Sequence, residues 1–367
     1  MVQTQAVRDI KSRLSGLKRG RRFIDYRESG PFAVELERLL DEINRQAESP
    51  RQGVELITAF IETDSAVLDR ADDSDGSIGG VYRVFACDSF VGHASRCDDK
   101  EWLHDLVLRL YMRDEYGVRD SLISSAVGFL PEAYLQRMVG EFWALAARES
   151  DEIKRYHWYL GIEAVARQLK DPALFEKACR AKWPELPAAG HLDIAQVYFE
   201  SGYAMAALQW LEKVPPGERF MIDEREQLLL KVASELGDQA RAEEVAWRIF
   251  RRSRSEARLS LLLDVIGYKE RERVIEGEIA TLMDAPGLNL NDTQFMMEAE
   301  RFDDAERYIA DRSTQLNGDL YTTLLPWAKT FEARAIPRCQ PDLPCVTRLD
   351  TSSRYFEVLF TRRTVLA

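Results

Sequence analysis

The sequence lacks any apolar stretch long enough to cross a lipid bilayer. A membrane-spanning helix needs roughly 18–20 consecutive apolar residues, whereas the longest apolar runs here, such as Phe142–Ala147, are only a few residues long. The N-terminus is charged and contains no apolar segment of the kind found in secretory signals. We therefore expect no membrane contact and a cytoplasmic location.

Cysteine, histidine and the usual catalytic motifs are also scarce. The five cysteines are an odd number without framework spacing, which favours reduced thiols in a cytoplasm. There is no Gly-x4-Gly-Lys-Ser/Thr phosphate loop, no His-Glu-x-x-His and no Gly-x-Ser-x-Gly. Cys87, His93, Cys97 and His104 lie close together, but not in the close pairs that structural zinc sites use. These absences predict a non-enzyme with no catalytic residue, cofactor or metal ion.

The length and charge of the chain indicate its domain organisation and limit its possible partners. At 367 residues the chain is longer than one compact core usually allows, so two domains or one elongated stack are expected. The net charge of −12 is uneven, because residues 1–27 contain eight basic and two acidic residues and carry +6, which leaves −18 for the remainder. Such an acidic chain repels nucleic acid as a whole, so any contact with nucleic acid must be local.

Signals for helices dominate the first 150 residues. Residues 7–22 are arginine-rich, and one helical face holds Val7, Ile10, Leu14 and Leu17. Such a segment can imitate a mitochondrial presequence, but an ordinary N-terminal helix is the favoured interpretation. Ser29 with Pro31, and Ser49 with Pro50, are typical helix starts. Residues 64–80 are a polar, glycine-rich break. The other helices are expected at about 32–47, 54–60, 81–96, 98–114 and 118–129, and from Pro131 onward.

From about residue 152 the pattern becomes periodic. Each unit reads as a helix, a tight turn and a second helix that opens with small residues. The turns fall at Lys170, Gly202, Gly237, Gly267 and Arg301, close to the 34-residue period of tetratricopeptide (TPR) repeats. Such helix pairs leave an apolar face that only a neighbouring pair can cover. An irregular helical bundle is the alternative.

The expected fold is therefore all-α, a TPR-like helical-repeat solenoid with an N-terminal helical region. Residues 1–150 form the N-terminal region, 151–335 the stack of helix pairs and 336–367 an irregular tail, which is rich in proline and arginine and has no helical stripe.

Four segments carry a family resemblance: Lys18–Glu28, Asp72–Gly76, Tyr116–Asp120 and Ala240–Phe250. Together they resemble a bacterial family of helical, TPR-like proteins known only as a domain of unknown function, and the likeness spans about residues 5–335. The resemblance implies the fold but no activity, substrate or catalytic residue. The tail departs from the family pattern, as if a change of reading frame had replaced the last helices. Loss of those helices would expose apolar surface and favour self-association.

The charged segments supply the candidate sites. Asp73, Asp75 and Gly76 match three positions of a calcium-binding loop, but the bidentate glutamate is missing. We expect the loop to cap the following helix instead. The preferred hypothesis pairs the basic segment with the loop. Its ion pairs would join the arginines of residues 19–27 to the loop aspartates: Arg19, Arg21, Arg22 and Arg27 with Asp72, Asp73 and Asp75.

Two binding functions remain open. The basic segment, with Phe23 and Tyr26 as stacking groups, is a candidate strip for nucleic acid. A second basic cluster is a candidate groove for an acidic peptide; it consists of Arg248, Arg251, Arg252, Arg254 and Arg258. Because stacked helix pairs present extended surfaces, a non-catalytic scaffold or adaptor for a protein or peptide is the favoured function. A nucleic-acid-associated accessory factor is the alternative.

Overall fold

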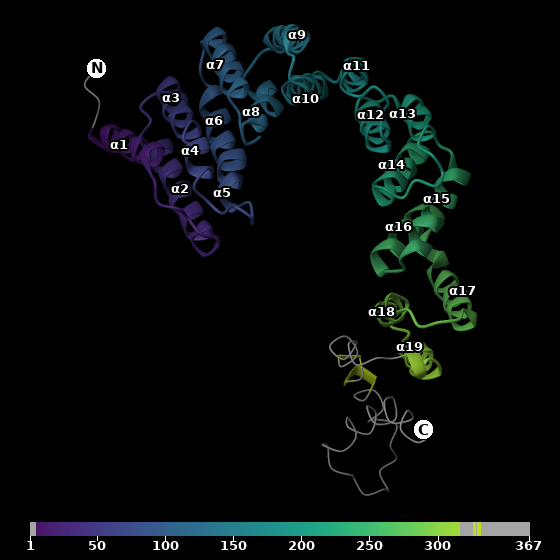
Figure 1. Ribbon diagram of the computed structural model, residues 1–367. Coiled ribbons are helices and arrows are strands. Elements are labelled where there is room, and N and C mark those ends of the chain that lie inside the picture. The colour runs from purple at the N-terminus through teal and green to yellow at the C-terminus, as the bar shows by residue number, and fades with distance from the viewer. Residues whose placement is uncertain (1–4, 316–325, 328, 332–367) are drawn as a thin grey trace, which may run out of the picture. The chain divides into compact units, whose positions relative to one another are not determined.

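The computed structural model of the chain describes residues 5–315, 326–327 and 329–331 (Figure 1). Every regular element in these residues is a helix, which confirms the all-α class, and one isolated parallel bridge joins Ile24 to Ala71. Within the same residues no helix is both long and apolar enough to cross a membrane. The predicted tail, 336–367, lies outside the described residues.

The chain divides into two compact units, Met1–Phe220 and Met221–Ala367. The main hydrophobic core of the first unit runs from Val7 to Ala178, and that of the second from Leu230 to Phe331. The first core therefore continues through residue 150, where the sequence pattern changes. The boundary expected at residue 150 marks the predicted start of the repeats, and it stays a prediction.

From residue 5 onward, where the structure describes it, the first unit contains fifteen α-helices and helical turns. They are α1 (Gln5–Arg19), α2 (Tyr26–Gln46), α3 (Pro50–Ile61), α4 (Asp64–Leu68), α5 (Ser77–Gly80), the π-helical turn η1 (Val81–Ala86), α6 (Cys87–Ala94), α7 (Lys100–Met112), α8 (Asp120–Ser124), the 3-10 turn η2 (Ala126–Gly128), α9 (Glu132–Arg148), α10 (Glu152–Leu169), α11 (Pro172–Lys182), α12 (Ala188–Glu200) and α13 (Ala204–Leu211).

The predicted apolar face of the N-terminal helix is confirmed, because Val7, Ile10 and Leu14 of α1 are buried. So is the start of α3, where the Ser49 side chain accepts a hydrogen bond from the Gln52 N–H. The start expected at Ser29 and Pro31 is wrong. Helix α2 begins earlier, because the Asp25 carboxylate accepts hydrogen bonds from two backbone N–H groups in its first turn and so fixes the helix start before the proline is reached.

The break expected over 64–80 is also partly wrong. It contains α4 and α5, and helical structure continues from Ser77 through η1 into α6. The loop caps α5 as expected, because the Asp73 carboxylate accepts hydrogen bonds from the N–H groups of Ile78 and Gly79. Gly76 has a left-handed φ of 70°, which lets the chain turn into the helix.

The second unit contains α14 (Ile222–Glu235), α15 (Gln239–Arg252), α16 (Glu256–Ile266), the 3-10 turn η3 (Tyr268–Glu270), α17 (Arg271–Asp284), α18 (Leu290–Glu298), α19 (Phe302–Asp311) and the 3-10 turn η4 (Ser313–Gln315).

The predicted tight turns are present in both units. Lys170, Gly202, Gly237 and Gly267 have positive φ angles of 53°, 85°, 69° and 98°, and the fifth turn has its positive φ at Glu300, one residue before the predicted Arg301. Helices packed across these turns include α10 with α11, α12 with α13, α14 with α15 and α18 with α19. A left-handed residue at the end of a helix reverses the chain abruptly, which makes the next helix its neighbour.

Candidate functional site

A surface pocket of about 710 Å³ lies in the first unit. Two loops, 183–187 between α11 and α12 and 212–221 after α13, supply most of its wall together with the ends of these helices. The lining combines two tryptophans with cations and acids: Arg180, Trp183, Pro184, Glu185, Leu186, Ala188, His191, Trp210, Lys213, Pro215 and Glu218. An aromatic surface hollow with a few charged groups is a typical ligand site.

The Trp210 ring is the centre of this pocket. It is only 5% exposed, and two cations lie over it: the Lys213 Nζ is 3.3 Å from the ring centroid and the Arg180 guanidinium carbon 5.1 Å. The ring of His191 lies 5.6 Å away. These contacts hold the cations by their attraction to the π-face, which does not consume their hydrogen-bonding groups.

A chain of hydrogen bonds orients Arg180 from outside the pocket. Its Nε donates to Glu176 at 2.8 Å, and the other oxygen of Glu176 accepts from the Tyr198 hydroxyl, also at 2.8 Å. Burial, followed by this hydrogen bond to Glu176, raises the pKa of Tyr198 to about 12. The phenol therefore stays protonated near neutral pH and keeps donating to Glu176.

A buried ion pair ties α11 to α10 next to the pocket. Lys182 lies 2.7 Å from Glu163, which is 8% exposed, and the Cys179 thiol donates to the same carboxylate at 3.2 Å. Burial, with the adjacent carboxylate, raises the pKa of Cys179 far above its usual range. Because only a thiolate is a good nucleophile, this cysteine is part of the packing.

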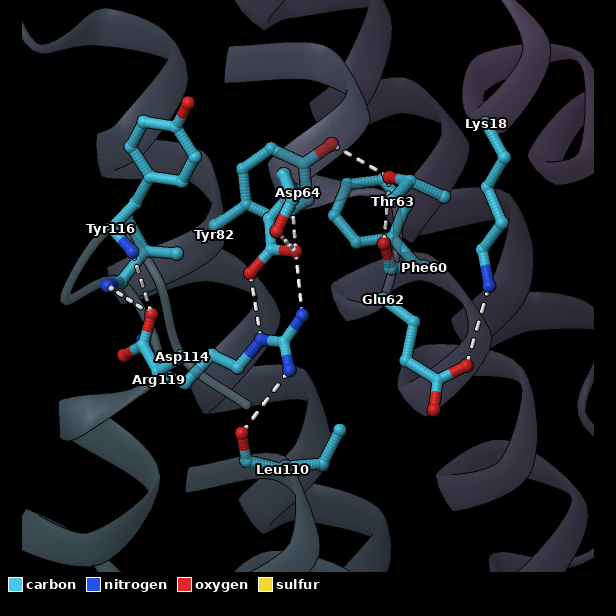
Figure 2. Close-up of polar contacts among 12 residues, drawn as sticks. Lys18, Phe60, Glu62, Thr63, Asp64, Tyr82, Leu110, Asp114, Tyr116 and Arg119 are labelled. Carbon is cyan, nitrogen blue, oxygen red and sulfur yellow. Dashed lines mark hydrogen bonds and ion pairs between the residues drawn. The ribbon is translucent and has the colours of Figure 1, made fainter. Parts of the chain in front are cut away.

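A second polar network lies inside the first unit, between α4 and the loop before α8 (Figure 2). Arg119 donates from Nε and from one terminal nitrogen to the two oxygens of Asp64, at 2.7 and 2.6 Å. The side chains are 5% and 1% exposed. The other terminal nitrogen donates to the Leu110 carbonyl at 3.1 Å. This geometry satisfies a buried charge pair with two parallel hydrogen bonds.

The Tyr116–Asp120 segment is shaped to present Arg119 to Asp64. The Asp114 carboxylate accepts hydrogen bonds from the N–H groups of Tyr116, Val118 and Arg119, and Gly117 has a φ of 67°. Figure 2 also shows Tyr82 of η1, whose hydroxyl is 2.7 Å from the Thr63 hydroxyl. The Asp64 and Asp114 carboxylates therefore both stabilise the fold.

The basic segment and the Asp-rich loop do meet, but through their backbones. The Ile24 N–H donates to the Arg70 carbonyl, and the Asp72 N–H donates to the Ile24 carbonyl, each at 2.8 Å. Arg70 also donates to the Arg22 carbonyl at 2.9 Å. The two backbone bonds to Ile24 form the isolated parallel bridge between Ile24 and Ala71, just before α2 begins.

The predicted ion pairs between these segments are not formed. Within residues 19–27 and 72–75, which are all described, no salt bridge joins Arg19, Arg21, Arg22 or Arg27 to Asp72, Asp73 or Asp75. Instead Arg22 pairs with Glu28, and Asp75 accepts hydrogen bonds from Ser77 and Ser29. Apart from Ser29, the donors to these aspartates lie two to six residues away, as the capping interpretation of this loop predicts.

The second basic cluster lies in the second unit, against acids of neighbouring helices. Glu278 of α17, 3% exposed, receives Arg251 at 2.8 Å and Arg254 at 2.7 Å. Glu226 of α14 receives Arg248 at 2.9 Å, and Arg252 is 2.8 Å from Asp223. An acidic peptide would have to compete with these carboxylates, so the groove expected here stays a prediction.

The aromatic cluster around His157 is core packing. The His157 ring is stacked on Tyr111, with centroids 3.9 Å apart, and Trp158 is buried beside them. Tyr111 donates to the His157 carbonyl at 2.7 Å, which joins α7 to α10. The aromatic pocket at Trp183 was not expected, because its two loops lie about thirty residues apart in the sequence and neither carries a motif.

Fold and sites together define a helical protein with a polar-aromatic surface pocket and buried ion pairs. Residues 2–182 match the family model described as a family of unknown function (DUF6880). The match contains Lys18–Glu28, Asp72–Gly76 and Tyr116–Asp120, and leaves out Ala240–Phe250. Neither the curated proteins nor the solved structures gave a significant match.

Proposed function

We propose that the chain is a non-catalytic adaptor that binds a protein or peptide at a surface formed by paired helices. The observation that carries this proposal is the pocket around Trp183 and Trp210, which joins exposed cations to aromatic and proline side chains. Helix pairs of TPR type commonly bind peptides on such surfaces. In this interpretation the pairs of each unit are TPR-like repeats.

The same proposal places the protein in the bacterial cytoplasm. The free cysteines among the described residues are Cys87, Cys97 and Cys179, all buried. Reduced cysteines within packed helices are common in cytoplasmic proteins.

The experiment compares retention of host proteins by two tryptophan variants. Trp183→Ala removes part of the pocket wall, whereas Trp247→Ala removes a half-buried tryptophan that also carries a cation, Arg251, but lines no part of this pocket. We expect the wild type and Trp247→Ala to retain the same proteins from a nuclease-treated extract, and Trp183→Ala to lose them. Retention that is unaffected by Trp183→Ala would contradict the proposal.

A second candidate, contact with nucleic acid, is favoured by the exposure of the basic segment. Phe23 and Tyr26 are 60% and 56% exposed, and Arg21, Arg22 and Arg27 beside them are exposed as well. Bases stack on such rings while arginines contact phosphates. Anisotropy of a labelled single-stranded oligonucleotide, measured with wild type and a Phe23→Ala/Tyr26→Ala variant at two salt concentrations, tests it. Binding that needs both rings and falls steeply with salt supports this candidate.

A further inference from the structure

The two cations over Trp210 have unused hydrogen-bond donors. In the described part of the chain the Lys213 ammonium has no carboxylate partner, since its contact is with the indole face. Among the residues that the structure describes, Arg180 donates only from its Nε, to Glu176, so both terminal nitrogens stay available. Cations anchored by a ring can still donate to an anion that enters the pocket.

The start of α12, which also lines the pocket, adds positive potential. Ala188, the first residue of α12, lines the pocket, and the preceding Pro187 provides no side-chain cap. The first N–H groups of a helix lack partners within it and carry the positive end of its dipole. The His191 Nδ1 lies 3.0 Å from the Pro187 carbonyl, so in the neutral ring Nδ1–H donates to this carbonyl, and Nε2 is an acceptor that adds no positive potential.

Apolar groups form the remaining wall. Trp183, Pro184 and Leu186 come from the loop before α12, and Pro215 from the loop after α13. The volume of about 710 Å³ lies within the usual range for sites that bury a ligand of several groups. A simple inorganic anion would leave this surface uncovered, whereas a bulky apolar side chain would cover it.

Two acids limit how negative the ligand can be. Glu185 is exposed at the pocket, and Glu218, whose carboxylate accepts the Phe220 N–H at 2.8 Å, lines the same hollow. A run of carboxylates would be repelled by these groups, while a single carboxylate can lie against Lys213 and Arg180.

From this arrangement we infer that the pocket receives an extended peptide in which one acidic residue stands beside a bulky apolar residue. The carboxylate binds Lys213 and Arg180, and the apolar side chain packs against Trp183 and Leu186. This inference rests on the proposed adaptor function and names the chemistry of its partner.

The experiment measures the tryptophan fluorescence of the full chain during titration with capped heptapeptides. One peptide has Glu-Leu at its centre within Gly and Ser, and the others carry Gln-Leu, Glu-Ser or Glu-Glu-Glu-Leu; inorganic phosphate is a separate titrant. We expect Glu-Leu to bind tightest, with about tenfold weaker binding when either the charge or the apolar group is removed.

Two lysine variants test whether the preference for the acidic peptide depends on Lys213. Lys213→Gln should remove the preference for Glu-Leu over Gln-Leu, and Lys231→Gln, which changes an exposed lysine of the second unit, should keep it. Circular dichroism confirms that both variants are folded. Equal binding of Gln-Leu and Glu-Leu to the wild type, tighter binding of the multiply acidic peptide, or phosphate binding as strong as that of the peptide would overturn the inference.

The outcomes for inference and function can be separated. If no heptapeptide binds but Trp183→Ala still loses host proteins, the peptide chemistry is wrong and the adaptor function stands. If no heptapeptide binds and Trp183→Ala retains the same host proteins as wild type, both are wrong.

Discussion

At the scale of single residues, charges inside the first unit are neutralised by partners distant in sequence. Asp64 and Arg119 form a buried pair in which both carboxylate oxygens accept hydrogen bonds (Figure 2). Removing one charge from such a pair leaves the other desolvated and unpaired, which costs far more than losing a surface pair.

We therefore expect Arg119→Met to lower the free energy of unfolding by about 3–5 kcal/mol. The double variant Asp64→Asn/Arg119→Met should lose less, because no buried charge is left alone. Arg22→Met, which removes an exposed arginine paired with Glu28, is the control and should change little. Urea denaturation measures all three. If Arg119→Met and the double variant lose the same free energy of unfolding, the unpaired charge of Asp64 is not the cause of the destabilisation.

His93 gives the stability of the first unit a dependence on pH. Burial, followed by the nearby Arg96, lowers the pKa of His93 below its ordinary value of 6.5. Between the two pKa values His93 is protonated in the unfolded chain but neutral in the folded chain. The free energy of unfolding therefore falls as the pH drops through 6.5 towards the lower pKa of the folded state.

His93→Gln should lose less stability than the wild type when the pH is lowered from about 7.5 to about 5.5, because the unfolded variant gains no proton at this position. Urea midpoints at the two pH values measure the difference. Parallel losses in the two proteins would assign the pH dependence to other groups.

At the scale of helices, two glycines differ in their surroundings. Gly53 of α3 faces α6, and a Cβ atom there would lie 2.2 Å from the His93 Nδ1. Gly140 of α9 has no neighbouring atom outside its own helix backbone within 4 Å of such a Cβ. The packing of α3 on α6 requires the absence of a side chain only at Gly53.

Gly53→Ala should therefore destabilise the protein by about 1–3 kcal/mol, the usual cost of overpacking. Gly140→Ala is the matched control and should stabilise it by up to about 1 kcal/mol, because alanine favours the helix more than glycine does. Thermal unfolding followed by circular dichroism compares them. A stabilising Gly53→Ala would mean that His93 moves aside without cost.

At the scale of the whole molecule, the two compact units meet in the chain at residues 220 and 221. The connection between α13 and α14 contains Pro215, Pro216 and Gly217, and Arg219 in it is exposed. Domain boundaries commonly lie in such exposed segments, and proteases cut there first.

Brief trypsin digestion should yield an N-terminal fragment that ends at Arg219 and persists while shorter fragments are still scarce. Mass spectrometry identifies its end, and Arg219→Gln should abolish that product. Early cleavage inside α1–α13 would contradict a compact first unit.

Much of the local structure could be predicted from the sequence. Apolar spacing placed α1 and α3, and glycine placed the turns at Gly202 and Gly237, because a glycine adopts positive φ without steric cost. The start of α2 at Asp25 was missed, although aspartate is a common cap, since Pro31 gave a competing signal a few residues later.

The partner of each charged group was decided only by the tertiary structure. Asp64 and Arg119 lie 55 residues apart, and the walls of the Trp183 pocket come from two separate loops. Helix propensity and apolar spacing depend on neighbours a few residues away, so the sequence by itself determined helices, turns and the all-α class. Ion pairs and pockets depend on which helices pack together, and many similar acids and arginines compete for those contacts until packing brings one pair together and buries it.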